Sequence, residues 1–226
     1  MKKIYVVTGG SSGIGFELVK LLSQENKVYV LSREAESIKN LNKGNVICIN
    51  TDIKEISQIE KSYQQIADKE GKIEALINCA GIAYEQKISG VEETDYEDIF
   101  DTNVKGLIFT TKLFLNIIKH NTGIICNISS IAGIKGFKNW SIYSASKFAV
   151  EGFTKSIREE VREMGIRVMS VQPGSVKTNI YKKISDEKKK DFMEAITIAR
   201  LIINALEMPK DAVIENVFIN NAAGDL

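Results

Sequence analysis

Hydrophobic residues fall into short unbroken runs that alternate along the chain with longer segments of mixed character. The short runs are rich in β-branched residues and have the length of strands. Because polar residues hardly interrupt them, they predict strands that are covered on both faces, as in a parallel sheet. The predicted strands are Ile4–Val7, Val28–Leu31, Val46–Asn50, Ala75–Asn78, Gly123–Ile128, Arg167–Gln172 and Val213–Ile219.

The longer segments between these runs show helical periodicity. The predicted helices are Gly13–Gln24, Glu55–Lys69, Asp95–Lys119, Ile142–Met164 and Lys188–Leu206. Strands that alternate with helices predict an α/β fold, with a parallel sheet and right-handed crossovers. No Pro- or Ser-rich linker interrupts the pattern. We therefore predict a single domain over residues 1–226, a doubly wound, Rossmann-type parallel sheet of about seven strands.

Local signals mark some of the boundaries. Thr94-x-x-Glu97 is a capping-box pattern before an apolar run, and Pro173-Gly174 ends the sixth strand. The segment Tyr181–Lys190 is rich in charged residues. It predicts a solvated loop or helix start, with a mobile lid as the alternative because of its place after Pro173-Gly174.

Charge and cysteine content narrow the class of protein. The net charge of +1 gives no basic excess for nucleic acid, so we expect no nucleic-acid partner. The apolar run at the N-terminus is too short for a signal-peptide core or a membrane span. Cys48, Cys79 and Cys126 are scattered and lack CxxC spacing, which favours reduced thiols in the cytoplasm. With His120 as the only histidine, we predict no metal site.

A glycine-rich loop joins the first strand to the first helix. Glycines allow a sharp turn and a close approach to a pyrophosphate, which also meets free N–H groups at the start of the helix. The alternative is a tight turn without a ligand. The candidate binding residues in this loop are Gly9, Ser11, Ser12, Gly13, Ile14 and Gly15.

A Tyr-x-x-x-Lys pattern opens the fourth long helix. Tyr143 and Lys147 are four residues apart, so their side chains share one helix face. A free tyrosine has a pKa of about 10, and a nearby ammonium group lowers it by favouring the phenolate. The pair therefore predicts a general acid/base. Taken alone, the pattern also fits a packed tyrosine followed by a solvated lysine.

The loop spacing TGxxxGxG and the order of the motifs resemble the short-chain dehydrogenase/reductase family along almost the whole chain. Asn78-Cys79-Ala80-Gly81 resembles the family's NNAG motif, with Cys79 in place of the second Asn. Pro173-Gly174 with Val176 and Thr178 resembles a clamp on the nicotinamide end of the cofactor. The resemblance assigns these residues, together with Tyr143 and Lys147, to cofactor binding.

The same resemblance assigns a catalytic group made of Asn103, Ser130, Tyr143 and Lys147. It implies that Tyr143 gives a proton to a carbonyl oxygen, while Lys147 lowers its pKa and holds the nicotinamide ribose. Ser130 is expected to hold the substrate oxygen, and Asn103 to organise a water molecule. Because neighbouring strand residues face opposite sides, we expect Ser130 to face the site and Ser129 to face away.

The residue after the second strand selects the cofactor. Ser32 stands where NAD-using relatives carry Asp, and Arg33 suits a 2′-phosphate, which favours NADP(H). Glu34 adds a negative charge nearby, so NAD(H) is the alternative. Asp52, with Ile53, resembles the family's adenine contact, although Asp52-x-x-Glu55 also reads as a helix N-cap.

The expected partner is a small or medium carbonyl or alcohol substrate, with no membrane. The expected pocket wall is mainly apolar and consists of Ile82, Ala83, Tyr84, Ile131, Phe137, Trp140, Ser175, Val176 and Tyr181. The short C-terminal portion resembles the branch that acts on small hydroxy acids with NADP. Apolar residues almost all round Leu107–Leu115 predict burial against a second copy, in a homodimer or homotetramer.

Two other functions compete with this prediction. A dinucleotide-binding sensor or scaffold without turnover would not need the Tyr143–Lys147 pair, which this chain retains. An epimerase or dehydratase of the extended branch shares the YxxxK pattern but needs another glycine spacing and a larger substrate domain.

Overall fold

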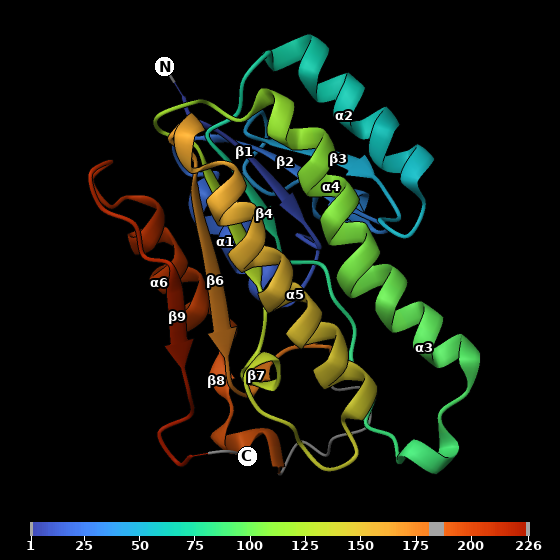
Figure 1. Cartoon of the computed structure of the whole chain (residues 1–226). Helices are drawn as coiled ribbons and strands as arrows, with labels where there is room; N and C mark the ends of the chain where they lie inside the picture. Colours follow the sequence, from blue (N-terminus) through green and yellow to red (C-terminus); the bar gives the residue numbers. More distant parts are fainter. Residues whose placement is uncertain (1, 181–187, 225–226) are drawn as a thin grey trace.

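The computed structural model describes residues 2–180 and 188–224 of the 226-residue chain. It confirms the predicted parallel sheet, with strand order β3-β2-β1-β4-β5-β6-β9 (Figure 1). Strand ends match the prediction to within one residue, except that the last strand begins at Asn216 instead of Val213. The strands are β1 (Ile4–Thr8), β2 (Lys27–Ser32), β3 (Val46–Asn50), β4 (Ala75–Asn78), β5 (Ile124–Ile128), β6 (Arg167–Pro173) and β9 (Asn216–Ile219).

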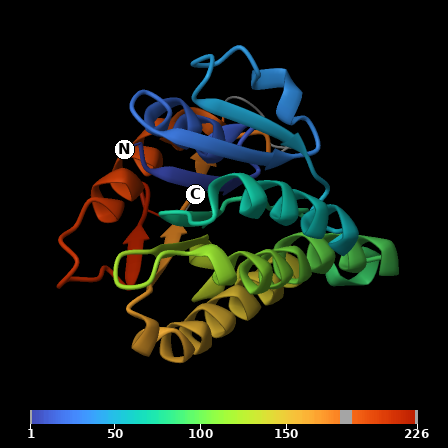
Figure 2. The same ribbon diagram turned by 90° about the horizontal axis from the view of Figure 1, so that it is seen from above.

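Helices cover both faces of the sheet (Figure 2). Successive strand residues point to opposite faces, so Val7 joins one buried core and its neighbour Val6 joins the other. One core packs under α1 (Gly13–Leu22) and α6 (Ala195–Leu206). The other packs under α2 (Ile56–Glu70), α4 (Leu107–Phe114) and α5 (Ser141–Glu160). Burial on both faces explains why the strands read as unbroken apolar runs.

The predicted helix Asp95–Lys119 is a rod of four consecutive pieces. They are α3 (Glu93–Phe100), the π-helical turn η3 (Asp101–Gly106), α4, and the 3₁₀ turn η4 (Leu115–Ile117). A π-helical turn holds more residues per turn than an α-helix and is frequent at functional sites. The sequence periodicity did not reveal it, and it lies at Asn103.

The predicted capping box at Thr94 is wrong, and so is the interpretation of Asp52 as an N-cap. The helix α3 begins earlier than expected, because Glu92 is its cap residue and donates its N–H to Asp95 at 3.2 Å. The helix α2 is preceded by Glu55, so Asp52 is not an N-cap. The Asp52 carboxylate instead accepts the N–H of Lys54 at 3.0 Å, which closes a local turn.

Of the predicted helix Lys188–Leu206, only the part from Ala195 onward forms an α-helix, α6. Before it lie a 3₁₀ turn, η7 (Lys188–Asp191), and a short strand, β8 (Met193–Glu194). The strand β8 pairs in parallel with β7 (Val176–Lys177), so tertiary pairing overrides local helix preference. The predicted loop or lid at Tyr181–Lys190 lies largely outside the described residues, and so does Tyr181.

The topology opens a crevice at one end of the sheet. The chain builds β1, β2 and β3 toward one edge and then returns to place β4 on the other side of β1. Ligands of open α/β sheets bind at such a switch point, beyond the carboxyl ends of the strands. Among the described residues, no helix has the length and apolar character needed to cross a membrane.

Candidate active site

A cavity of about 570 Å³ lies at the carboxyl ends of the strands and adjoins the glycine loop. This volume is in the usual range for small-molecule sites. Most of the predicted cofactor residues line it, and these are Gly9, Ser11, Ser12, Gly13, Ile14, Ser32, Arg33, Asp52, Ile53, Ala80, Gly81, Tyr143, Lys147, Pro173, Gly174, Val176 and Thr178. Residues far apart in sequence therefore share one wall.

Close packing explains the glycine spacing in the loop. A Cβ at Gly9, whose φ is +66°, would lie 2.7 Å from the Ala80 Cα. A Cβ at Gly15 would lie 2.4 Å from the Gly9 carbonyl oxygen. No side chain fits at these distances. Gly15 does not line the cavity but allows α1 to begin directly against the loop.

Thr8, at the end of β1, fastens this loop to the next wall of the cavity. Its Oγ1 accepts the N–H groups of Cys79 and Ala80 at 3.1 and 3.2 Å. Thr8 was not among the predicted site residues. The Thr8-Gly9 pair could have indicated this role of Thr8, because a buried threonine between two strand ends needs hydrogen-bond partners.

The cofactor-selecting residues lie at the end of β2. The Ser32 hydroxyl is 2.7 Å from the Ser11 hydroxyl, which ties the selector to the glycine loop. Arg33 is exposed, lines the cavity and has no hydrogen bond to any described residue. Its guanidinium group is therefore available to an anionic ligand.

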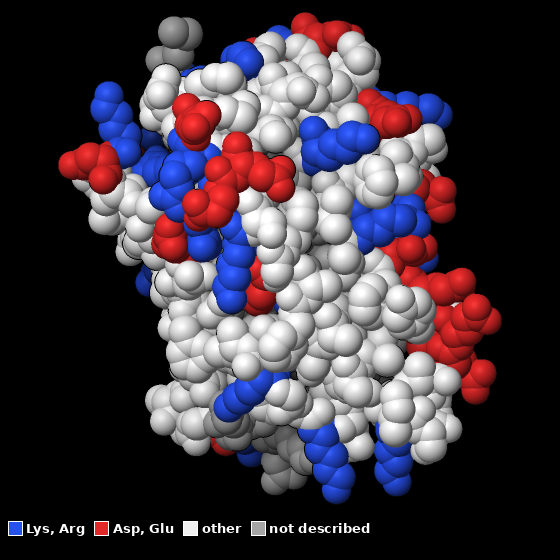
Figure 3. Space-filling view, viewed as in Figure 1, with Lys and Arg blue, Asp and Glu red and all other residues white. Residues whose placement is uncertain are grey.

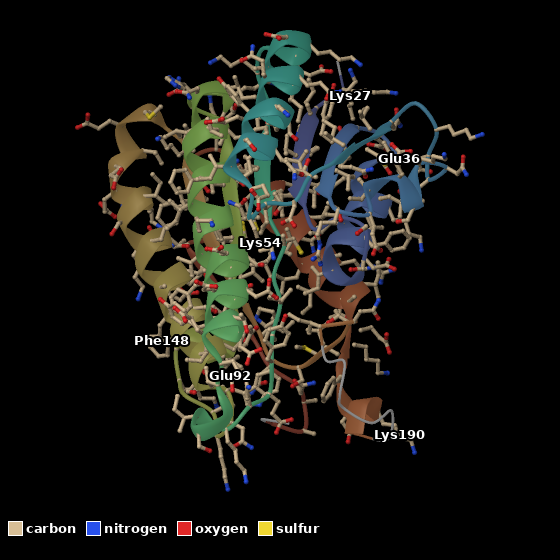
Figure 4. The ribbon with its side chains drawn as sticks, turned by 90° about the vertical axis from the view of Figure 1, so that its right-hand side faces the viewer. Lys27, Glu36, Lys54, Glu92, Phe148 and Lys190 are labelled. Atoms are coloured by element: carbon tan, nitrogen blue, oxygen red, sulfur yellow. The ribbon has the colours of Figure 1, made fainter. Side chains whose placement is uncertain are left out.

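Near Arg33, the predicted wall residue Tyr84 forms a cluster with Lys54 and Asp98, which were not predicted. The Asp98 carboxylate accepts the Lys54 Nζ at 2.8 Å and the hydroxyl of Tyr84. Burial opposes ionisation of Asp98, but the two hydrogen bonds together lower its pKa. Burial and the Asp98 contact raise the pKa of Tyr84 to about 12, so Tyr84 stays a phenol. Lys54 lies beside the rod of α3, η3 and α4 (Figure 4).

Tyr143 and Lys147 project from the first turns of α5 into the other end of the cavity. The Lys147 Nζ is 5.7 Å from the centroid of the Tyr143 ring and donates to the Ile128 carbonyl oxygen at 2.9 Å. Lys147 is 4 % exposed, and this burial lowers its pKa to about 8. An ammonium group at this position favours the phenolate form of Tyr143.

Ser129 and Ser130 both border the cavity. The Ser129 hydroxyl is fully buried and lies against Gly133, as expected for a side chain that faces away from the site. The Ser130 hydroxyl accepts the Ala132 N–H at 3.1 Å and caps the 3₁₀ turn η5 (Ile131–Gly133).

Asn103 lies behind the cavity wall, at 1 % exposure on the π-helical turn. Its amide binds both backbone groups of Ile82, each at 2.9 Å, and also donates to Ser146 at 3.1 Å. A Cβ at Gly81 would lie 3.3 Å from the Asn103 Oδ1 and 3.7 Å from the Lys147 Nζ. Gly81 therefore lets Asn103 and Lys147 approach each other.

Asn78 does not reach the cavity. Its amide nitrogen donates to Thr111 and to Asn127, both at 2.9 Å, inside the protein. The neighbouring Cys79 does line the cavity, and burial raises its pKa to about 12. The three cysteines are free thiols, and the described residues contain no cluster of ligands that could hold a metal ion.

The predicted clamp after β6 is braced by the C-terminal segment. The Asn221 side chain accepts the Ser175 N–H at 3.0 Å and donates to the Ser175 carbonyl at 3.0 Å and the Asp191 carbonyl at 2.9 Å. A Cβ at Gly174 would lie 2.3 Å from the Asn220 Oδ1. No local pattern predicts this role of Asn221, because it joins segments far apart in the chain.

Part of the predicted substrate wall is in place. Ile82, Ala83, Tyr84 and Val176 line the cavity. Ile131, Phe137, Trp140 and Ser175 do not line it, although Phe137 and Trp140 pack in the same apolar cluster as Tyr143. The Trp140 and Tyr143 rings meet edge to face, with centroids 5.7 Å apart. Thr51, Asn179 and Ile180 line the cavity without having been predicted.

The residues present fit a nicotinamide dinucleotide. The glycines leave a cradle that side chains would fill, and the cavity runs from Arg33 to the buried pair on α5. Hydrogen-bond donors along the cavity suit the phosphate and ribose oxygens of such a cofactor.

Comparisons with known proteins agree with this geometry. A model of the family described as short chain dehydrogenase matches residues 3–189. The sepiapterin reductase of Chlorobaculum tepidum is 29 % identical over 241 aligned positions, covering 100 % of this chain and 99 % of that protein. A structure of ElxO with NADP bound has a TM-score of 0.86 and 27 % identity, covering 97 % of this chain and 98 % of ElxO. The closed form of serine dehydrogenase with NADP⁺ has a TM-score of 0.88 and 25 % identity, covering 95 % of this chain and 93 % of the enzyme.

Proposed function

Because the chain belongs to the short chain dehydrogenase family, we propose that it is an NADP(H)-dependent oxidoreductase that interconverts a small or medium carbonyl compound and its secondary alcohol. One observation carries this proposal. A buried ammonium group, that of Lys147, lies 5.7 Å from the Tyr143 ring in the cavity that the glycine loop borders. A sensor without turnover has no use for such a pair.

The bound nicotinamide supplies or accepts the hydride. Tyr143 gives its phenolic proton to the substrate oxygen in reduction and takes that proton back in oxidation. The charge of Lys147 favours the phenolate form of Tyr143, and its Nζ would hold a ribose hydroxyl of the cofactor. The Ser130 hydroxyl, on the same cavity, orients the substrate oxygen. Asn103 holds the Ile82 backbone, and with it the loop that carries Ala80 and Gly81.

The preference for NADP(H) rests on the end of β2. Arg33 has the charge and the freedom to bind a 2′-phosphate, and Ser32 leaves room that an acidic residue would deny. The ElxO and serine dehydrogenase structures were determined with NADP-type cofactors, which supports the same choice. Glu34, also on the cavity, is the reason to test NADH beside NADPH.

The substrate end of the cavity favours a compact carbonyl compound. The side chains near Tyr143 are apolar, and Ser130 adds a hydroxyl group. The similar proteins carry the names of a pterin reductase and a serine dehydrogenase, so both chemistries belong in the substrate panel.

We also propose a homodimer or homotetramer that works in the cytoplasm, where its three free thiols stay reduced. Figure 3 shows a largely uncharged area over the middle of this face, where α5 passes α4, while acidic side chains gather over α3 at its edge. Phe148 is 48 % exposed and projects outward from α5 (Figure 4). Light scattering tests this: a monomer at micromolar concentration contradicts the assembly.

The test of the reaction is oxidation of NADPH and of NADH in the presence of diketones, 3-oxo acids, aldehydes, cyclic ketones and a pterin, with NADP⁺-dependent oxidation of serine beside it. Tyr143→Phe serves as the blank. We expect NADPH-dependent turnover that disappears in the blank. Turnover that persists in Tyr143→Phe would contradict the assigned acid/base.

A further inference from the structure

The helix α5 carries a third buried polar residue in register with the acid/base pair. Glu151 follows Lys147 by four residues, as Lys147 follows Tyr143, so the three side chains lie along one helix face. Glu151 is 3 % exposed and Lys147 is 4 % exposed. A buried carboxylate one turn from a buried ammonium group is costly to maintain without a role.

Two residues of β6 hold the Glu151 carboxylate in place. The Ser170 hydroxyl donates to one oxygen at 2.6 Å, and the Gln172 amide donates to the other at 2.8 Å. Gln172 directly precedes Pro173-Gly174, the segment that lines the cavity. The carboxylate thus joins the helix of the acid/base pair to the strand that leads to the cofactor clamp.

The loop that carries Ser130 also rests on this side chain. A Cβ at Gly133, in η5, would lie 3.0 Å from the Glu151 Cγ and 2.9 Å from the Lys147 carbonyl oxygen. Glu151 therefore sits where α5, β6 and η5 meet. Its position is fixed by three elements that each bring a residue to the site.

Among the groups that act on Lys147, Glu151 is the one that supplies a negative charge. Among the described residues, neither side chain forms an ion pair within 4.0 Å, and the Lys147 Nζ binds only a carbonyl oxygen. Burial lowers the pKa of Lys147 to about 8, while the Cys79 sulfur and the Glu151 carboxylate act in the opposite direction. Burial raises the pKa of Cys79 to about 12, so it is a neutral thiol near pH 7. Glu151 then supplies the negative charge.

The other ionisable side chains on the surrounding elements are occupied or neutral. Arg158, two turns further along α5, donates to the Val168 carbonyl at 3.0 Å and to Glu215, which precedes β9. Those that face this region are Tyr143, Lys147 and Arg158 on α5, Cys79 after β4, and Glu215 before β9.

We propose that Glu151 is a positioning residue that keeps Lys147 charged, and so sets the upper pH limit for cofactor binding and for catalysis. The inference rests on the proposed function, because it takes Lys147 to hold the cofactor ribose. A nearby negative charge opposes the loss of the proton from Lys147.

The test is the dissociation constant for NADPH, measured from pH 6 to pH 10 by quenching of the fluorescence of Trp140, the only tryptophan. In the wild-type protein, we expect affinity to fall as the pH passes about 8, where Lys147 loses its charge. In Glu151→Gln, which keeps the size of the side chain, this fall should move to lower pH by about one unit. If NADPH affinity falls at the same pH in Glu151→Gln as in the wild-type protein, the inference is overturned.

Three variants separate charge from structure. Glu151→Asp keeps the charge and should keep the wild-type midpoint. Ser170→Ala removes one hydrogen bond and no charge, so a shift equal to that of Glu151→Gln would assign the effect to structure and overturn the inference. In Lys147→Met, NADPH affinity should no longer fall at this pH. Combining this change with Glu151→Gln should leave the pH dependence of NADPH affinity the same as in Lys147→Met alone.

The wild-type protein gives a second test if Glu151→Gln does not fold. In the wild-type protein, the fall in NADPH affinity should have its midpoint above about pH 7. A midpoint below that value would mean that no counter-charge supports Lys147, and it would overturn the inference. Failure of the wild-type protein to bind NADPH overturns the proposed function together with the inference. Normal binding and turnover with an unshifted Glu151→Gln overturns the inference alone.

Discussion

The Asn103 side chain binds both backbone groups of Ile82, with its Oδ1 accepting the N–H and its Nδ2 donating to the carbonyl, each at 2.9 Å. The two residues belong to different layers, one on the π-helical turn and one in the loop after β4. This reciprocal pair of bonds fixes the loop that carries Ala80 and Gly81 on the cavity wall.

Replacing Asn103 by Ala should therefore lower stability as well as activity. Two buried backbone groups of Ile82 lose their partners, which costs about 2–4 kcal/mol in unfolding free energy. Thermal melting and the NADPH dissociation constant measure the two effects. Asn116→Ala is the matched control, because Asn116 is exposed and its side chain donates only to the Leu113 carbonyl. Equal melting temperatures for Asn103→Ala and wild type would contradict the role.

Replacing Arg33 by Ala should weaken NADPH much more than NADH. A charge-assisted bond to the 2′-phosphate contributes about 1.5–3 kcal/mol, which corresponds to a loss of about ten- to a hundredfold in affinity. Titration of both cofactors by fluorescence gives the ratio. Glu34→Ala is the control, and it should leave NADPH binding unchanged or stronger. Equal losses for the two cofactors would sink the assignment of Arg33.

Replacing Tyr143 by Phe should remove turnover and keep cofactor binding. The phenolic proton is lost while the ring stays in its apolar cluster with Trp140. General acid catalysis typically contributes about 10²–10⁴ in rate. Steady-state rates and the NADPH dissociation constant separate the two effects. A large loss of NADPH affinity would show that the hydroxyl acts in binding instead.

The lowered pKa of Lys147 predicts a pH-dependent stability. Below pH 8 the folded protein keeps a buried charge that the unfolded chain exposes to water, at a cost of about 3 kcal/mol. Between pH 8 and 10.5 the folded lysine loses its proton first, so the stability of the wild type rises relative to Lys147→Met. Denaturant unfolding of both proteins at pH 7, 9 and 10 measures the gap. A gap that stays constant with pH would contradict the lowered pKa.

Replacing Asn221 by Ala should make the predicted clamp after β6 less rigid, although Asn221 itself does not line the cavity. The change leaves the Ser175 backbone without its two side-chain bonds and the Asp191 carbonyl without one. We expect weaker binding of NADPH, a lower melting temperature, and little change in kcat at saturating cofactor. Exchange of the Ser175 amide hydrogen should become faster. An unchanged dissociation constant would restrict Asn221 to a structural role.

Local sequence signals predicted the sheet well, and they also placed Tyr143 and Lys147 together on one helix face. The apolar runs defined the strands to within about one residue, because burial on both faces leaves little freedom of composition. Tyr143 and Lys147 could be paired because a single helix fixes their spacing. Helix starts were less predictable, since Glu92 and Glu55 took cap positions that the sequence assigned to Thr94 and Asp52.

Contacts between distant segments were beyond the sequence pattern. Asn221 binds residues 46 and 30 positions away, and Asp98 meets Lys54 across 44 positions. The strand β8 was read as helix because its partner β7 lies 17 positions earlier.

The spacing along α5 makes the chain unequally tolerant of changes in length. Tyr143, Lys147 and Glu151 share one helix face, and inserting a single residue between any two of them would turn the later one by about 100°. The segment from Tyr143 to Glu151 is therefore the part of α5 in which a change of length would separate these side chains, whereas substitutions on the opposite face of the same turns leave their alignment intact.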